Sequence, residues 1–452
     1  MVDAVETPDG PGHVVGSGVL RCLPPTHADG TITLRYEGTD HAGAHHRFTE
    51  TIELPGRLED ADADVVGPLL ALLSGAASLS YFKALAPGRL EVPDGLTDVE
   101  RHFLTELSAH GLGEFAYEND LPAVLDTPVV GPTLPPRPTG QDRERPVRRA
   151  LTAVGGGKDS IVSIEALKRA GYDVGLFSVN SYAPIEATAR VAGLPLLSAR
   201  RRLDPALFAL NAAGAPNGHV PVTAVNSIVA LLTALALGFD TVAFSNEASA
   251  SYGNVVWHER TINHQWSKGR DFEQLLRGAL PAGAPTYLSL LRPLTELRIA
   301  RHFAGLTAYH PVFTSCNRAF KLDAAARTSW CGDCPKCRFV FLCLAPFLPG
   351  PALLAIFGGR DLFADPAQRT GFLELLGVDG LLKPFECVGE PDECRVALQL
   401  LRSHPDWRDH PILGDPAVAA ITATEADAAA AFAFRGDEHV LPADLEAVVR
   451  AL

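Results

Sequence analysis

From Arg149 onward the sequence alternates short apolar runs with amphipathic stretches that end at glycine, and this alternation restricts the fold more than any other feature. The apolar runs have the length of buried strands and lie at 151–154, 174–179, 194–198 and 241–245. The amphipathic stretches predict helices at 160–170, 185–192 and 220–237, closed by Gly171, Gly193 and Gly238. Strands that alternate with helices form a parallel sheet with helices on both faces. We therefore expect an α/β core whose ligand binds at the carboxyl ends of the strands.

The 452 residues are too many for one ordinary core, and the sequence divides into four regions. Residues 1–122 predict an α+β N-terminal domain, with a hairpin from 31–36 and 48–54 and helices at 65–85 and 99–110. Closely spaced prolines predict an extended linker over 123–148. Residues 149–345 form the catalytic core with a cysteine-rich insertion, and the alanine- and leucine-rich residues 346–452 predict a helical C-terminal region.

The formal net charge of -14 argues against broad binding to nucleic acid or to an anionic membrane, because both need a basic face. The first residues show no signal-peptide pattern. Polar residues interrupt the apolar stretch at 220–238, and prolines interrupt the one at 339–357, so neither predicts a membrane span. We therefore expect a cytoplasmic protein.

A loop of three glycines followed by lysine, aspartate and serine joins the first core strand to its helix: Gly155, Gly156, Gly157, Lys158, Asp159 and Ser160. Glycine lets the backbone approach a phosphate closely, and the N–H groups at a helix start attract the anion. Lys158 can neutralise phosphate charge, Asp159 can hold a magnesium ion, and Ser160 can cap the helix or bind a phosphate oxygen. The loop is not a Walker A loop, because Asp159 follows Lys158. The alternative is an ordinary glycine-rich turn.

This loop resembles the Ser-Gly-Gly-x-Asp-Ser loop of the ATP-pyrophosphatase (PP-loop) superfamily, with Gly155 in the position of the first serine. Members cleave ATP to AMP and pyrophosphate and adenylate a carboxylate or carbonyl oxygen. The resemblance implies a HUP-like parallel sheet as the core. It also implies that adenine meets the end of the second core strand, at Ser178, Val179 and Asn180.

A cysteine cluster lies further along the chain, with Cys316 upstream of the closely spaced Cys331, Cys334 and Cys337. Four thiolates satisfy a tetrahedral zinc ion, and a closed site of this kind is structural. An iron–sulfur cluster and a set of metal-free thiols are the alternatives. The cluster is similar to that of 7-cyano-7-deazaguanine synthase, another PP-loop enzyme, which is one rival assignment.

The polar segment from Ser245 to Glu273 follows the fourth core strand, where a substrate loop belongs in such a sheet. With the sequence 219–224, it resembles the UDP-N-acetylmuramoyl-L-alanyl-L-glutamate epimerase family. The resemblance covers the chain in length and order, and it is motif-specific from about 151 to 341. It implies an ATP- and magnesium-dependent isomerase that inverts the terminal L-glutamate of a UDP-muramoyl-dipeptide in peptidoglycan synthesis. A non-enzymatic nucleotide-sensing protein of the same fold is the other rival.

The resemblance also implies an acyl-adenylate, from which a base takes the α-proton. Lys158 and Asp159 would then serve ATP and its magnesium ion, and Glu247 a second magnesium ion or the substrate. The candidate acid–base groups are His258, His264 and Lys268. Lys268 is preferred, because a lysine desolvated in a closed pocket has a pKa lowered toward neutrality.

Three consecutive arginines follow the third predicted core strand: Arg200, Arg201 and Arg202. They could meet the anionic nucleotide tail of the substrate. A solvated basic patch is the alternative interpretation.

Overall fold

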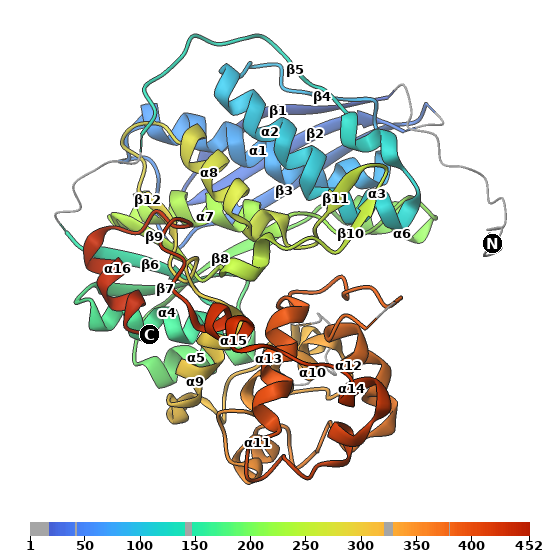
Figure 1. Ribbon diagram of the computed structural model, residues 1–452. Helices are drawn as coiled ribbons and strands as arrows, with labels where there is room; N and C mark the ends of the chain where they lie inside the picture. Colours follow the sequence, from blue (N-terminus) through green and yellow to red (C-terminus); the bar gives the residue numbers. More distant parts are fainter. Residues whose placement is uncertain (1–17, 41–42, 141–146, 321–328, 379) are drawn as a thin grey trace, which may run out of the picture.

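The structure is a computed structural model that describes residues 18–40, 43–140, 147–320, 329–378 and 380–452. A ten-stranded sheet runs through it in the order β12-β9-β6-β7-β8-β3-β2-β1-β4-β5 (Figure 1). Its first five strands are parallel: β12 (Thr286–Ser289), β9 (Thr241–Phe244), β6 (Arg149–Ala153), β7 (Asp173–Val179) and β8 (Leu196–Arg202). The predicted parallel α/β core is therefore confirmed, and β12 adds an edge strand that was not predicted.

Helices cover both faces of the parallel strands, as predicted. On one face α4 (Lys158–Arg169) and α5 (Ala183–Ala192) join one hydrophobic core. On the other face α7 (Val222–Leu237) joins a second core, while the short α6 (Pro205–Ala212) lies beyond β8 in the chain. Gly193 and Gly238 end α5 and α7 in the left-handed conformation, which glycine adopts without steric cost.

The N-terminal region continues the same sheet. The predicted hairpin is present as β2 (Thr31–Thr39) and β3 (His45–Glu53), flanked by β1 (Val19–Ala28). Two further short strands, β4 (Arg89–Glu91) and β5 (Val129–Val130), complete its edge. Because β3 pairs antiparallel with β8, the region shares its sheet with the core, a continuity that the local sequence patterns do not contain.

Three helices follow in the N-terminal region: α1 (Ala63–Leu85) packs against β1 and β2, α2 (Asp98–Gly111) packs against α1, and α3 (Gly113–Asn119) comes next in the chain. By length and composition α1 could cross a membrane, but 89% of its most apolar window is buried inside the protein. Its apolar composition is thus explained by its place in the second core, where it contacts β1, β2 and α7.

The proline-rich segment 123–148 is mostly extended where it is described, and residues 141–146 lie outside the described residues. A 3-10 turn (Pro122–Asp126) opens it and β5 follows. Isolated bridges then tie Thr133 to Leu96 and Thr139 to Pro281. The segment therefore passes from β5, at one end of the strand order, toward the residues just before β12, at the other end, with a few backbone anchors (Figure 1).

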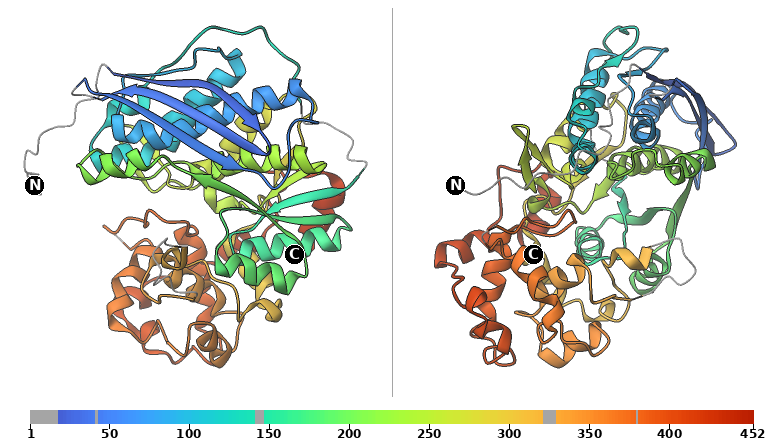
Figure 2. Two further views of the ribbon diagram at one scale, coloured as in Figure 1. Left: turned by 180° about the vertical axis from the view of Figure 1, so that it is seen from behind. Right: turned by 90° about the vertical axis from the view of Figure 1, so that its right-hand side faces the viewer.

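The C-terminal region is helical, as predicted, and forms a lobe beside the carboxyl ends of the core strands (Figure 2). Its helices are α10 (Pro335–Leu344), α11 (Gly350–Ile356), α12 (Arg369–Leu375), α13 (Pro391–Leu401), α14 (Pro416–Ala419), α15 (Glu425–Phe432) and α16 (Ala443–Arg450). The lobe shares the core of α4 and α5, and α9 (Glu296–Ala304) packs against α4, α10 and α13. The last helix, α16, returns to α4.

Candidate active site

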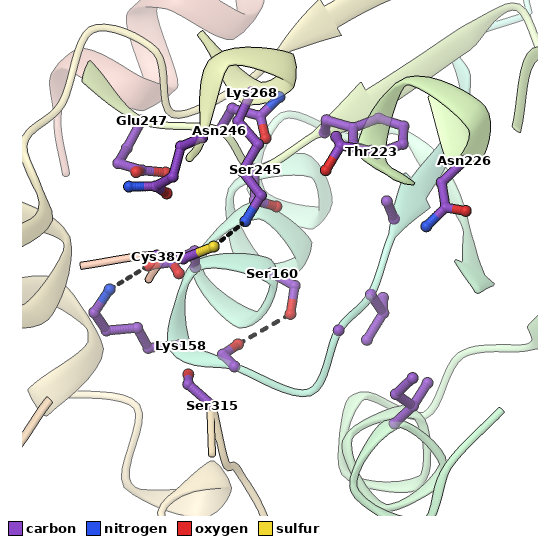
Figure 3. A pocket seen from close by; sticks show the side chains of 18 of the residues that line it. Lys158, Ser160, Thr223, Asn226, Ser245, Asn246, Glu247, Lys268, Ser315 and Cys387 are labelled. Atoms are coloured by element: carbon purple, nitrogen blue, oxygen red, sulfur yellow. Dashed lines mark hydrogen bonds and ion pairs between the residues drawn. The ribbon is translucent and has the colours of Figure 1, made fainter. Parts of the chain in front are cut away.

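A cavity of about 510 Å³ lies where β6, β7 and β9 end. Its walls come from parts of the chain that are distant in sequence, and Figure 3 shows many of the side chains. They are the glycine loop, the end of β7, the starts of α7 and α9, the segment after β9, the residues around the cysteine cluster, and a loop of the C-terminal lobe. The cavity therefore lies at the carboxyl ends of the parallel strands, where a ligand is expected in such a sheet.

The glycine loop is held by the segment that leads to the cysteine cluster. The amide of Thr314 donates to the carbonyl of Gly156 at 2.9 Å. Gly156 has φ +80°, which favours glycine, and a Cβ atom on Gly157 would lie 2.6 Å from Ser315 Oγ, so a larger residue there would displace that hydroxyl. The Ser160 hydroxyl donates to the Gly157 carbonyl, and no side chain caps the start of α4. The first-turn N–H groups of α4 therefore remain available to an anion.

Lys158 is buried at the start of α4, with 2% of its side chain exposed. Its Nζ atom lies 2.5 Å from Asp159 Oδ1 and also donates to Glu296, the first residue of α9. Burial lowers the pKa of Lys158, but the two carboxylates raise it more, so the ammonium stays charged. Glu296 was not predicted from the sequence; its only signal is its place at the first turn of a helix capped by Thr295.

Glu247 and Glu296 both line this end of the cavity and are both buried. Burial, and then the nearby Asp159 carboxylate, raise the pKa of each above its ordinary value. Two lysines, Lys158 and Lys268, oppose that shift for Glu247. Asp159, Glu247 and Glu296 together make a favourable position for a divalent cation, which would relieve the repulsion between the carboxylates.

The predicted adenine-facing residues divide into two groups. Ser178 and Val179 line the cavity, beside Phe177. Asn180 does not line it; its side-chain amide pairs with the backbone of Arg201 instead. Ser178 Oγ also lies 2.9 Å from Ser198 Oγ on β8.

Of the three predicted acid–base groups, Lys268 lines the cavity and His264 lies next to it. His258 is exposed at the turn between β10 (Val255–Trp257) and β11 (Arg260–Ile262), a two-stranded hairpin, and does not line the cavity. The expected lowering of the Lys268 pKa is wrong. Burial lowers it, but Cys387 and Glu247 raise it more, so the pKa lies above the ordinary value and Lys268 is cationic.

Cys387 is a lining residue that the sequence analysis did not identify. It lies in the loop between α12 and α13, and Lys268 Nζ is 3.0 Å from its sulfur (Figure 3). Ser315, Asn317 and Lys336, all close to the cysteine cluster in sequence, also line the cavity. A single cysteine in an irregular loop carries no pattern that would have marked it.

The three consecutive arginines belong to the end of β8 rather than following it. Arg201 is buried and pairs with Glu50 of β3 at 2.6 Å, and it also donates to Ser80 of α1. Arg202 pairs with Glu53 at the surface. Arg201 therefore joins the N-terminal region to the core, and none of the three arginines lines the cavity.

The four predicted zinc ligands come together. The sulfurs of Cys316, Cys331, Cys334 and Cys337 all lie within 4.8 Å of one another, and all four residues are buried. Three sulfur–sulfur distances are 3.5, 3.7 and 4.0 Å. Tetrahedral zinc with bonds of about 2.3 Å requires about 3.8 Å between sulfurs, so the geometry fits. Backbone amides of Gly332 and Asp333 donate to two of the sulfurs.

Comparisons with known proteins agree in pointing to one family. Residues 24–290 match the family model described as the MurL N-terminal domain, and residues 312–432 match the MurL C-terminal domain. A protein of Salinispora tropica is 53% identical over 374 residues, which cover 81% of each chain. One of a Micromonospora species is 50% identical over 408 residues, covering 88% of this chain and 90% of its own. One of Xanthomonas oryzae pv. oryzae is 44% identical over 382 residues, covering 81% and 82%.

All three relatives are named UDP-N-acetyl-alpha-D-muramoyl-L-alanyl-L-glutamate epimerase. No solved structure matches the chain significantly.

Proposed function

The chain belongs to the UDP-N-acetyl-α-D-muramoyl-L-alanyl-L-glutamate epimerase (MurL) family, and we propose that it inverts the terminal glutamate by way of an ATP-derived acyl-adenylate. The epimerase activity follows from the family. The adenylation, its metal ions and the residues that carry it are inferred from the cavity.

Activation by ATP would make the α-proton of glutamate easier to remove. A free carboxylate resists loss of its α-proton, because the product would be an enediolate with a negative charge on each of its two oxygens. An acyl-adenylate removes one of those charges and makes the carbonyl a better electron sink. After inversion, hydrolysis of the adenylate releases AMP and leaves the D-glutamate centre.

The glycine loop and Lys158 provide a phosphate site for this chemistry. The uncapped start of α4 presents N–H groups, and Lys158 adds a buried positive charge that its carboxylate neighbours keep protonated. Asp159, Glu247 and Glu296 would hold magnesium, which when bound would neutralise charge on the phosphates. Phe177 and Val179 give an apolar wall for adenine, with Ser178 beside them.

A structural zinc ion at the cysteine cluster would hold residues next to the phosphate site in place without contacting the substrate. The segment from Thr314 to Asn317 contains Cys316, and its Thr314 and Ser315 contact the glycine loop. Lys336, between two of the proposed ligands, lines the cavity. A closed four-thiolate site has no free position for substrate, so its role would be to fix these residues in place.

One observation carries the proposal: a loop built for phosphate, a buried lysine and three carboxylates line one cavity in a chain of this epimerase family. The composition and the free cysteines in the described residues fit a reducing, cytoplasmic location.

The test incubates the protein with UDP-N-acetylmuramoyl-L-alanyl-L-glutamate, ATP and magnesium, then analyses the nucleotides and the configuration of glutamate. We expect AMP and pyrophosphate to form only with the dipeptide substrate, together with D-glutamate. An ATP analogue with a non-hydrolysable link between its α- and β-phosphates should stop both. ADP and phosphate as products, or full epimerisation without ATP, would overturn the adenylation.

A further inference from the structure

We propose that Cys387 is the base that takes the α-proton of the adenylated glutamate, with Lys268 beside its sulfur and a His264–Glu114 pair behind it. This inference rests on the proposed adenylation for the identity of the activated substrate. It assigns the proton transfer to a residue from the C-terminal lobe, a part of the chain that carries no recognisable catalytic pattern.

Cys387 occupies the right place for such a role. It lines the cavity that contains the glycine loop, and it is half-buried rather than sealed in the core. Among the eight cysteines, four form the zinc-type cluster, and Cys22, Cys343 and Cys394 are buried elsewhere. Cys387 is therefore the thiol that a molecule in the cavity can reach.

Two basic groups near its sulfur come from the segment after β9. Lys268 Nζ lies 3.0 Å from the sulfur. His264, four residues earlier in the chain, lies close enough to lower the pKa of the Cys387 thiol, and its Nδ1 atom pairs with Glu114 of α3. A thiol next to an imidazole that a carboxylate orients is an arrangement that activates a nucleophile or a base.

These contacts determine the charge on each group. Burial alone would raise the pKa of Cys387, but Lys268, Lys336 and His264 lower it well below its usual range. Burial lowers the pKa of His264, but Cys387 and Glu114 raise it more, to about 9. The resting state at neutral pH is therefore a thiolate between an ammonium and an imidazolium, with the Glu114 carboxylate behind the imidazolium.

The neighbouring His219 differs from His264. Its ring centroid lies 4.4 Å from that of His264. Burial, and then the charge of His264, lower its pKa to about 4, so it is neutral. One positive imidazole, and not two, therefore faces the thiolate.

The proton transfer balances with these groups. The Cys387 thiolate takes the proton from the α-carbon, the C–H electron pair forms a double bond to the carbonyl carbon, and the carbonyl π pair moves to oxygen. Lys268 can donate to that oxygen. The oxygen pair then re-forms the carbonyl while the α-carbon takes a proton from water on its opposite face, which gives the D centre and leaves hydroxide. The Cys387 thiol gives its proton to that hydroxide, so water and the thiolate are both restored.

The test separates proton transfer from activation by measuring both in deuterated water. Cys387→Ser should lower deuterium incorporation at the α-carbon about 100-fold or more, the range for loss of a general base. Its formation of AMP from ATP should remain within a few-fold of normal. The matched control is Cys22→Ser, the same change at a buried site on β1, which should leave both rates unchanged.

Several outcomes would overturn the proposal. The first is deuterium exchange at the normal rate in Cys387→Ser. The second is equal loss of AMP formation and of exchange in Cys387→Ser that is correctly folded. The third is a substrate-sized mass adduct on Cys387 in the unaltered enzyme. The adduct would show a nucleophile instead of a base. If the unaltered protein epimerises without forming AMP, the adenylation fails, but the exchange measurement still tests Cys387.

The roles of Lys268 and His264 can be tested separately, by the pH dependence of Cys387 alkylation. Iodoacetamide should alkylate Cys387 at a rate that is already high near pH 6, because the thiolate is present. Peptide mass spectrometry measures that rate. Lys268→Met and His264→Asn should each move the midpoint of that pH profile upward. An unchanged profile in both variants would show that neither residue stabilises the thiolate and would overturn the arrangement.

Discussion

Replacing Lys158 by methionine tests the phosphate site most directly. Methionine has a similar length without the charge, so packing changes little while the electrostatics change fully. Lys158 is 2% exposed and serves two carboxylates, Asp159 and Glu296. Loss of one preorganised charge in a closed site typically costs about 100- to 1000-fold in rate. We expect that loss in substrate-dependent AMP formation.

The same change should also lower stability, because Glu296 remains buried without its cation. Removing one partner of a buried ion pair costs about 3–5 kcal/mol. The double variant Lys158→Met with Glu296→Gln removes the stranded charge as well. We expect the free energy of unfolding of the double variant to fall by less than the sum of the two single losses, by about 1 kcal/mol or more, as coupled neighbours do. Its AMP formation should stay low.

Urea unfolding followed by circular dichroism gives the stabilities, and chromatography of the nucleotides gives the rates. Lys168→Met is the matched control, since Lys168 lies on the same helix in an exposed pair with Glu165. That variant should unfold within about 0.5 kcal/mol of normal and keep its activity. Near-normal AMP formation by Lys158→Met would refute the phosphate role, and strictly additive stabilities would refute the buried pair.

Three further predictions concern other parts of the molecule. Gly157→Ala should raise the KM for ATP strongly, because its Cβ atom would meet Ser315 Oγ. Gly155→Ser, with open space around it, should leave that KM within a few-fold, and equal effects of the two changes would contradict this. Elemental analysis should find about one zinc per chain. Cys334→Ser should lose the zinc and have a lower melting temperature, and zinc-free protein of normal stability would refute a structural zinc site. Burial raises the pKa of Glu393 to about 7, so its contribution to stability is full below about pH 4.5 and is lost as pH rises through 7. Relative to Glu393→Gln, the unaltered protein should therefore lose about 3 kcal/mol between pH 4.5 and 8; parallel pH curves from urea unfolding would count against it.

Features encoded close together in sequence could be predicted without the structure. The glycine loop occupies six consecutive residues between a strand and a helix, and its position at the carboxyl end of the sheet follows from that context. Three of the four clustered cysteines fall within seven residues, and the fourth also joins them in space. The alternation of strands and helices, with glycines at the helix ends, likewise depends on local backbone preferences.

The tertiary structure decided everything that depends on distant neighbours. The continuous sheet arises because β3 pairs with β8, which buries Arg201 against Glu50 instead of leaving it for a ligand. Glu296 and Cys387 reach the cavity from chain segments that carry no motif. The Lys268 pKa shows why such features escape sequence reasoning. Burial, which a sequence pattern can suggest, lowers that pKa, but the charges of Cys387 and Glu247 reverse its direction. Those charges act over a few ångströms, and only the folded chain sets which of them lie that close.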